Sequence, residues 1–207
     1  MPGDIRLRPA RPADAAEAAP LIYAAGPTLY TLMFGPDPAD VIRLFERLFV
    51  LPCNPFSHER GLLAERDGRV VGLALAAPVA SPRWSGLRMA FLLPRLRGLL
   101  PLLRCRRELR DVGACISALP RDAYYLGILA VTPEERSRGV GSALIEEVHH
   151  RARMALTPGV ALHAEIDNTV ALRFYARHGY VETQRRVASP RLARQGIAGL
   201  ATLRKTL

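Results

Sequence analysis

The spacing of apolar residues changes along the chain between a helical period and a strand-like alternation, and these changes predict the order of elements. In the first half, residues 5–9 alternate apolar and polar and predict a short strand. Helical spacing follows over residues 15–25, where Gly26-Pro27 ends the helix, and it returns between Pro36 and Pro52. Asp67-Gly68 joins the apolar runs 62–65 and 70–77 and predicts a hairpin, with Gly72 marking a bulge or a close approach.

The second half of the chain alternates strands and helices in the same way. The mostly apolar run Tyr124 to Val131 predicts a buried strand, and apolar residues at i, i+4 and i+8 from Val140 predict a helix up to Met154. Residues 160–166 form the next predicted strand. Asn168 and Gly179 then bound a helix as its N-cap and its C-terminal glycine. Residues 180–187 and 199–206 predict the last two strands, and we expect the arginine-rich link 185–195 to be an exposed loop.

Residues 81–120 interrupt this order before the strand at Tyr124. Leu and Arg cluster there at helical spacing, with breaks at Pro94, Gly98 and Pro101, and they predict two or three short amphipathic helices. Such helices can simply pack on the core, cover a pocket as a lid, form a dimer interface or touch an anionic membrane surface. The breaks spoil a continuous interfacial helix, so the first three roles are favoured over the membrane surface.

The loop between Val131 and the helix after it has the chemistry of an anion site. The loop, Arg136-Ser-Arg138-Gly139-Val-Gly141-Ser142, leads into a helix N-terminus, where unpaired N–H groups and the helix dipole attract negative charge. Two glycines leave those N–H groups accessible, and two arginines can bind phosphate, although two glycines can also simply make a tight turn. The loop lacks the Gly-Lys-Ser/Thr of a P-loop, and Leu144 replaces the third glycine of a dinucleotide fingerprint.

Two motifs in this half of the chain resemble those of the Gcn5-related N-acetyltransferase (GNAT) superfamily. The first is Arg-x-x-Gly-x-Gly, Arg136 to Gly141, and the second is Asn-x-x-Ala-x-x-Phe-Tyr, Asn168 to Tyr175, followed by Gly179-Tyr180. The similarity is specific over residues 123–187, loose over 4–79 and absent from 81–120. It implies that residues 1–207 form a single GNAT domain. The implied fold is α/β (α+β), with a mixed, twisted central sheet flanked by helices and a helical insertion (81–120) before the central strand.

The resemblance also implies an acetyl-CoA-dependent N-acetyltransferase that moves an acetyl group to a primary amine. Transfer would be direct, in a ternary complex, because no Cys or Ser stands in a recognisable nucleophile–base arrangement. The implied pyrophosphate-binding residues are Arg136, Arg138, Gly139, Val140, Gly141 and Ser142. The backbone of Leu129, Ala130 and Val131 would pair with the pantetheine arm, where the strands 124–131 and 160–166 splay apart.

Two further residues take roles from the second motif. Asn168 would contact the cofactor arm, and Tyr175 would bind at the thiol end and donate a proton to the departing thiolate; the alternative for Tyr175 is a core aromatic. The strand YYLGILAV carries no acid that can serve as the general base. Glu165, Glu65 and His163 are candidates from neighbouring strands, and a water chain to backbone carbonyls is an equal alternative. We name Glu165 as the candidate catalytic carboxylate beside Tyr175.

Composition and charge narrow the other possibilities. The net charge is +10, but only Lys205 among 29 basic residues is a lysine, and the dispersed arginines lack interleaved aromatics. The charge is therefore interpreted as mostly solvated surface rather than a nucleic-acid site. No uninterrupted apolar run reaches ~18 residues, so no membrane span is predicted. The N-terminus lacks the basic and then apolar pattern of a signal peptide. Cys53, Cys105 and Cys115 lie far apart, which argues against disulfides or a metal site and is typical of a reducing cytoplasm.

Other functions stay open from the sequence alone. One is an acyl-CoA-binding but non-catalytic regulatory module, and another is a basic binder of nucleic acid or a membrane surface. We expect a small-molecule or peptide amine as the partner, no nucleic acid, and a homodimer as one mode of assembly. The acceptor itself is not specified, because small amines, antibiotics, amino acids, protein N-termini and lysines all fit.

Overall fold

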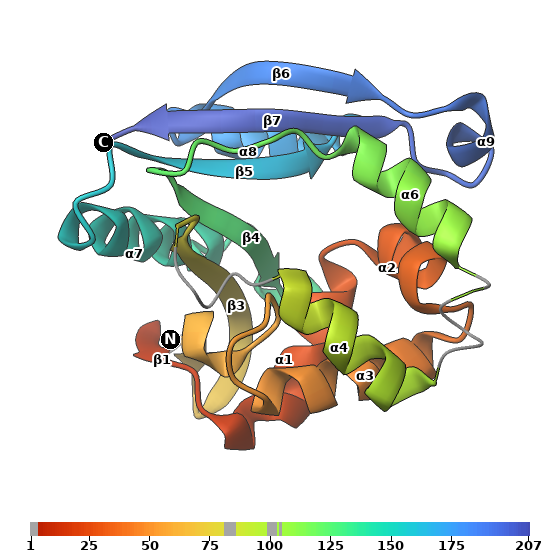
Figure 1. The fold of residues 1–207 in the computed structure, drawn as a ribbon. Helices are drawn as coiled ribbons and strands as arrows, with labels where there is room; N and C mark the ends of the chain where they lie inside the picture. The colour runs from red at the N-terminus through yellow and green to blue at the C-terminus, as the bar shows by residue number, and fades with distance from the viewer. Residues whose placement is uncertain (1–3, 81–85, 99–102, 104) are drawn as a thin grey trace.

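The computed structural model describes residues 4–80, 86–98, 103 and 105–207 (Figure 1). Its strands are β1 Arg6–Pro9, β2 Gly61–Arg66, β3 Arg69–Pro78, β4 Tyr124–Val131, β5 Gly159–Glu165, β6 Val181–Val187 and β7 Gly199–Thr206. They form one seven-stranded sheet in the order β1-β2-β3-β4-β5-β7-β6. β4 and β5 are parallel, and all other neighbouring pairs are antiparallel. The predicted mixed sheet is confirmed.

Helices cover both faces of this sheet. They are α1 Ala15–Ala24, α2 Pro27–Phe34, α3 Pro38–Val50, α4 Gly86–Arg97, α6 Arg106–Cys115, α7 Val140–Met154, α8 Thr169–Arg177 and α9 Pro190–Ala193. Successive residues of β3 supply the two cores in turn, because side chains alternate along a strand. Leu73 and Leu75 pack with α1 and α3, whereas Ala74 and Ala76 pack with α7. None of the described helices is long and apolar enough to cross a bilayer.

Gly72 and Gly127 mark two irregular points in the centre of the sheet. A Cβ on Gly72 would lie 2.9 Å from Cγ1 of Val140, so α7 approaches β3 closely there, as the sequence predicts. In β4, Leu75 pairs with Ile128 but Ala76 pairs with Leu126, which leaves Gly127 as a bulge. The extra residue reverses the alternation: Leu126 faces the α7 core, whereas Ile128 faces the α1–α3 core.

Gly26-Pro27 ends α1, as predicted, but it also begins α2, which was not predicted; Pro27 occupies the first turn of the new helix, where its missing N–H costs nothing. Two other local predictions are wrong. Pro94 does not break α4, since Leu92, Leu93 and Leu96 pack against the core and hold the helix together on both sides of it. The link 185–195 is not a plain loop: it contains the end of β6 and α9, whose Leu192 is buried.

The predicted insertion forms short helices that pack on the core. α4 ends at Gly98, as expected, whereas the break expected at Pro101 lies outside the described residues. Val112 and Cys115 of α6 share a small apolar cluster with α2, α9 and the first residues of β7. Arg191 of α9 also forms ion pairs with Glu108 and Asp111 of α6. The insertion therefore contacts both an early element of the chain, α2, and late ones, α9 and β7.

Candidate active site

A cavity of about 420 Å³ opens where β4 and β5 separate. The two strands pair only at Tyr124–Val160 and Tyr125–Ala161. The bulge at Gly127 follows directly, and a bulged strand bends away from its neighbour. Gly127 and Leu129 line the cavity, and beyond Tyr125 the side of β4 that faces β5 has no strand partner in the described chain. Its backbone groups are available for a ligand.

Besides Leu129 and the alternative base His163, three residues predicted for the site line this cavity: Asn168, Tyr175 and Glu165. Asn168 caps α8, with Oδ1 accepting from the Ala171 N–H at 3.0 Å, so its side-chain amide N–H groups stay available. Burial raises the pKa of Tyr175, whose hydroxyl makes no hydrogen bond within the part of the chain that the structure describes. Burial, and then the charge of Asp167, raise the pKa of Glu165 above its ordinary value.

The other two candidate bases have different surroundings. Glu65 accepts a hydrogen bond at 2.6 Å from Nε of Arg8 on the β1 side of the sheet, and it does not line the cavity. His163 does line it, but Nε2 lies 3.1 Å from the Ser117 carbonyl oxygen and Nδ1 lies 3.3 Å from the Tyr125 hydroxyl. A neutral His163 therefore donates through Nε2 and accepts from Tyr125. Burial lowers the pKa of His163, which keeps the ring neutral.

Tyr125 and the aromatic residues Tyr30, Phe34 and Phe56 belong to the cavity but were not singled out from the sequence. Burial raises the pKa of Tyr125 to about 12, so it is a hydrogen-bond donor at neutral pH. The doublet Tyr124-Tyr125 inside an apolar strand was the available signal, because a buried tyrosine hydroxyl usually needs a partner. No sequence signal pointed to Tyr30 and Phe34, because α2, which carries them, was not predicted.

The loop predicted to bind pyrophosphate leads from β4 into α7. Gly139 has φ +85° and is the N-cap of α7. The N–H groups of Val140, Gly141 and Ser142 come before the first i→i−4 bond, from Ala143 N to Gly139 O, and so lack helical partners. The Val140 side chain is fully buried, which leaves only its backbone for a ligand. The Ser142 hydroxyl lies 3.1 Å from Nε2 of His178, joining α7 to α8.

Two salt-bridged residues outside the motif hold this loop. Arg66, at the end of β2, is nearly buried, forms an ion pair with Glu135 and donates to the Arg138 carbonyl at 3.4 Å. Arg138 itself lies 3.5 Å from Glu135 and is largely exposed. Arg136 is also exposed, and its Nε lies 3.4 Å from the Val131 carbonyl oxygen. Each contact uses one guanidinium nitrogen, so both arginines keep further N–H donors for a phosphate.

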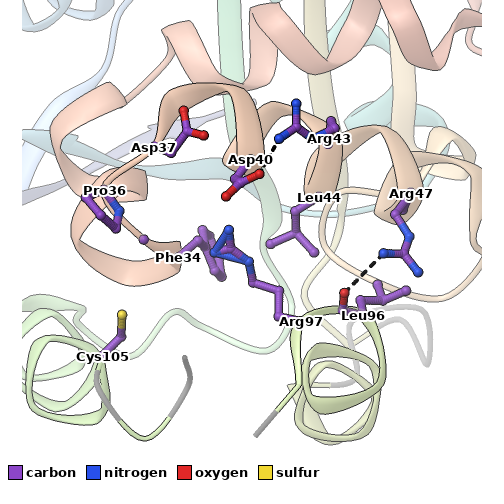
Figure 2. Close-up of a pocket in the computed structure, with 11 residues that line it drawn as sticks. Phe34, Pro36, Asp37, Asp40, Arg43, Leu44, Arg47, Leu96, Arg97 and Cys105 are labelled. Carbon is purple, nitrogen blue, oxygen red and sulfur yellow. Dashed lines mark hydrogen bonds and ion pairs between the residues drawn. The ribbon is translucent and has the colours of Figure 1, made fainter. Parts of the chain in front are cut away.

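A second cavity, of about 530 Å³, lies between α3 and α4 (Figure 2). Asp40 pairs with Arg43, and Arg47 donates to the Leu96 carbonyl at 3.1 Å. Figure 2 shows Arg97 projecting from α4 into the cavity beside Phe34. Phe34 lines both cavities, but none of the residues predicted for the active site lines this one. The cavity between β4 and β5 is therefore the candidate active site.

Comparison with protein families agrees with this geometry. Residues 105–182 match the acetyltransferase (GNAT) domain family. The matched residues contain α6, β4, the anion loop, α7, β5 and α8, and so both sequence motifs. Residues 105–182 therefore match a GNAT acetyltransferase domain, and the predicted resemblance is confirmed. The match also takes in α6, which the sequence assigned to the insertion.

Solved structures share the fold over nearly the whole chain. An N-acetyltransferase from Staphylococcus aureus is 17% identical, with a TM-score of 0.71, and covers 96% of this chain and 99% of its own. A structure described as histone acetyltransferase HPA2 and related acetyltransferase, from Corynebacterium glutamicum, is 22% identical, with a TM-score of 0.64 and coverages of 100% and 97%. A PaiA N-acetyltransferase from Thermoplasma acidophilum, in complex with coenzyme A, is 12% identical, with a TM-score of 0.54 and 99% coverage of both chains. No protein of curated function matches the sequence.

Proposed function

We propose that the chain catalyses the transfer of an acetyl group from acetyl-CoA to a primary amine, directly and within a ternary complex. The observation that carries this proposal is the convergence of three features on one cavity: the unpaired side of β4, the residues Asn168 and Tyr175, and the carboxylate of Glu165. Each corresponds to a requirement of amide formation from a thioester, namely positioning, a proton donor and a proton acceptor.

The donor side of the site fits coenzyme A. The backbone of Leu129, Ala130 and Val131 offers hydrogen bonds to an extended pantetheine arm, as an added strand would. The N–H groups at the start of α7 can hold the pyrophosphate, and Gly141 keeps that surface open. A Cβ at Gly141 would lie 3.4 Å from the Phe174 ring, so the glycine also lets α7 and α8 pack closely. The relative from Thermoplasma acidophilum was solved with coenzyme A, which supports this assignment.

The chemistry assigns one proton transfer to each titratable residue. The amine nitrogen forms a bond to the thioester carbonyl carbon while the carbon–sulfur bond breaks, giving an amide and a free thiol without oxidation or reduction. Glu165, ionised, accepts the proton that the attacking amine loses. Tyr175, like any tyrosine, is protonated at neutral pH, and its raised pKa keeps it so; it donates a proton to the departing sulfur. Water in the open cavity returns Tyr175 and Glu165 to their starting states.

The test of this function is a panel of primary amines incubated with acetyl-CoA, with free thiol measured as the product. Thiol release that depends on both the protein and the amine is expected, with the acetylated amine found by mass spectrometry. Tight acetyl-CoA binding without amine-dependent thiol release from a broad panel would instead favour a non-catalytic acyl-CoA-binding module. Free thiols at Cys53, Cys105 and Cys115 are compatible with the cytoplasm, where we propose the enzyme works.

A further inference from the structure

We propose that the acceptor is an apolar primary amine, of the aryl- or alkylamine class, that carries no anionic group. The inference rests on the proposed function, because it concerns the acceptor side of the same cavity. It follows from the charge, the aromatic wall and the size of that cavity.

The charge of the wall is the first argument. Among the described residues that line the cavity, Glu165 is the one charged side chain, and none is an arginine or lysine. The chain as a whole carries 29 Lys and Arg and a net charge of +10, so this absence is local. A protonated amine entering the cavity meets a carboxylate. A carboxylate or phosphate on the acceptor would be desolvated beside Glu165 without a cation, which is costly.

The neighbouring cavity has a mixed, mostly basic lining. Arg43, Arg47 and Arg97 line it together with Asp37 and Asp40 (Figure 2), and none of these three arginines lines the cavity between β4 and β5. Of the residues that the structure describes, Phe34 alone lines both cavities. Arginines are therefore present near the site, but the fold keeps them on the other side of an aromatic ring. An anionic part of an acceptor would find no cation among the described residues that line the active-site cavity.

Aromatic rings form the wall opposite the splayed strands. Phe56 meets Tyr30 and Phe34 edge to face, with centroid distances of 6.0 Å and 6.1 Å, and Tyr30 stacks on Phe34 at 6.2 Å. Phe45 packs behind them, 4.9 Å from Tyr30 and 4.7 Å from Phe56. A wall of packed rings is rigid, suits a flat apolar group and attracts an ammonium ion to its ring faces.

The helices of the insertion complete the apolar surface. Met89 and Leu93 of α4, Leu109 and Val112 of α6, and Ile116 just after α6 all line the cavity. A cavity of about 420 Å³ also has room for such a ligand. Benzene fills an engineered cavity of roughly 150 Å³ in another protein, so a single ring leaves space for the thioester end of the donor.

Binding measured by calorimetry tests the inference independently of catalysis. The protein is saturated with coenzyme A, and phenethylamine, phenylalanine and ethanolamine are titrated in turn. Phenethylamine and phenylalanine differ only by the carboxylate, and ethanolamine lacks the apolar group. Phenethylamine should bind at least about tenfold more tightly than either. Equal affinities, a preference for phenylalanine or ethanolamine, or no binding of phenethylamine would overturn the inference.

A matched pair of variants locates the preference in this cavity. Ile116→Arg adds a cation to the wall at a side chain that is 46% exposed, so the fold should tolerate it. Val50→Arg adds the same charge at a residue that is 45% exposed and does not line the cavity. Ile116→Arg should reduce the preference for phenethylamine over phenylalanine by about tenfold, while Val50→Arg should leave it unchanged. An equal effect of both variants, or an effect of neither, would contradict the assignment.

The transfer assay separates this inference from the proposed function. Binding of phenethylamine without amine-dependent thiol release would contradict the proposed function and support the acceptor class. Transfer to phenylalanine or ethanolamine as fast as to phenethylamine would support the proposed function and overturn the acceptor class. Hexanoyl-CoA provides a last check. If it replaces acetyl-CoA at full rate and prevents phenethylamine from binding, the apolar wall serves the acyl chain, and the inference is wrong.

Discussion

Burial in one apolar cavity raises the pKa of both Glu165 and Tyr175, with different consequences for each. A carboxylate with a raised pKa is a stronger base, which suits the removal of a proton from an amine. A tyrosine with a raised pKa is always protonated at neutral pH, but it is a weaker acid. The shift therefore favours Glu165 in its proposed role more than it favours Tyr175.

Replacing Tyr175 by Phe tests the acid role. The change keeps the ring that packs 5.6 Å from Tyr180 and removes the hydroxyl. A positioned general acid contributes about a hundredfold to ten-thousandfold, and we expect the lower end because a thiolate is a fair leaving group. kcat should fall while KM for acetyl-CoA changes little, because the interaction forms mainly in the transition state. Turnover within about threefold of that of the unmodified protein would show that Tyr175 is not the proton donor and serves only as a core aromatic.

Replacing Glu165 by Gln tests the base role through the pH profile. Because the pKa of Glu165 is raised, kcat/KM should decrease as the pH falls through that pKa and the carboxylate takes up a proton. Glu165→Gln should lower kcat/KM by about a hundredfold or more and abolish this acid limb. Glu65→Gln is the control, since Glu65 lies outside the cavity and pairs with Arg8. An acid limb that persists in Glu165→Gln would assign the base to another group, such as water held near His163.

The residue types of the site were predictable only where a motif fixed their position. Asn168 and Tyr175 come from one helix with a recognisable spacing. Glu165 and Glu65 looked equivalent in the sequence, because only strand register separates them. Register places Glu65 opposite Arg6, next to Arg8, whereas Glu165 ends β5 at the cavity. The Tyr125–His163 contact depends on a two-pair parallel ladder that no local pattern encodes.

At the scale of elements, side-chain contacts fix the loop before α7 to β2 and join the start of α7 to α8. Arg66 and Glu135 fix the loop to β2, and Ser142 and His178 join the start of α7 to the end of α8. The loop is thus held between β2 and α8, and Ala171 and Tyr175 of α8 also line the cavity. If the loop binds pyrophosphate, α8 connects that site to the cavity.

Replacing Gly141 by Asp tests whether the loop binds pyrophosphate. Two unit charges 4 Å apart repel by about 4 kcal/mol at an effective dielectric constant of 20, so we expect acetyl-CoA affinity to fall by about a hundredfold after screening. Gly141→Ala is the steric control: its Cβ meets the Phe174 ring at 3.4 Å, and affinity should fall only slightly. Calorimetry measures both. Equal losses in the two variants would show that packing, and not anion binding, explains the glycine.

Helices and strands were predicted correctly where the hydrophobic pattern within the segment was enough to indicate them. β2, β3, β4, β5 and β7 show as apolar or alternating runs because their side chains face defined cores, whereas β6 is exposed along its whole length. α2 was missed because Gly26-Pro27 reads as a stop, although the same dipeptide begins a helix whose Phe34 is buried by distant residues. α9 was missed for a similar reason: its four residues are held by contacts with distant parts of the chain, where Leu192 packs in a cluster with α6 and Arg191 pairs with Glu108.

At the scale of the molecule, the insertion could be located in the sequence but its role could not. α6 packs on α2, α9 and β7, and α4 packs on α3. These partners are far apart in the chain, so no local pattern chooses between a wall, an interface and simple packing. The structure places apolar residues of both helices in the cavity, and it leaves the opposite side of α4 exposed, where Phe91 is 63% exposed.

A pair of substitutions on the two sides of α4 distinguishes a pocket wall from a dimer interface. Leu93 lines the cavity, and Phe91, two residues earlier, faces away from it. Leu93→Ser removes apolar contact with the acceptor and should raise KM for phenethylamine by about tenfold, without changing acetyl-CoA affinity. Phe91→Ser should leave both unchanged if α4 serves only as a wall. If α4 instead forms a dimer interface, Phe91→Ser should lower the mass measured by light scattering, while Leu93→Ser keeps the kinetics of the unmodified protein. That second result would assign the insertion to a dimer interface, because the loss of an apolar side chain from a pocket wall should weaken the binding of an apolar acceptor.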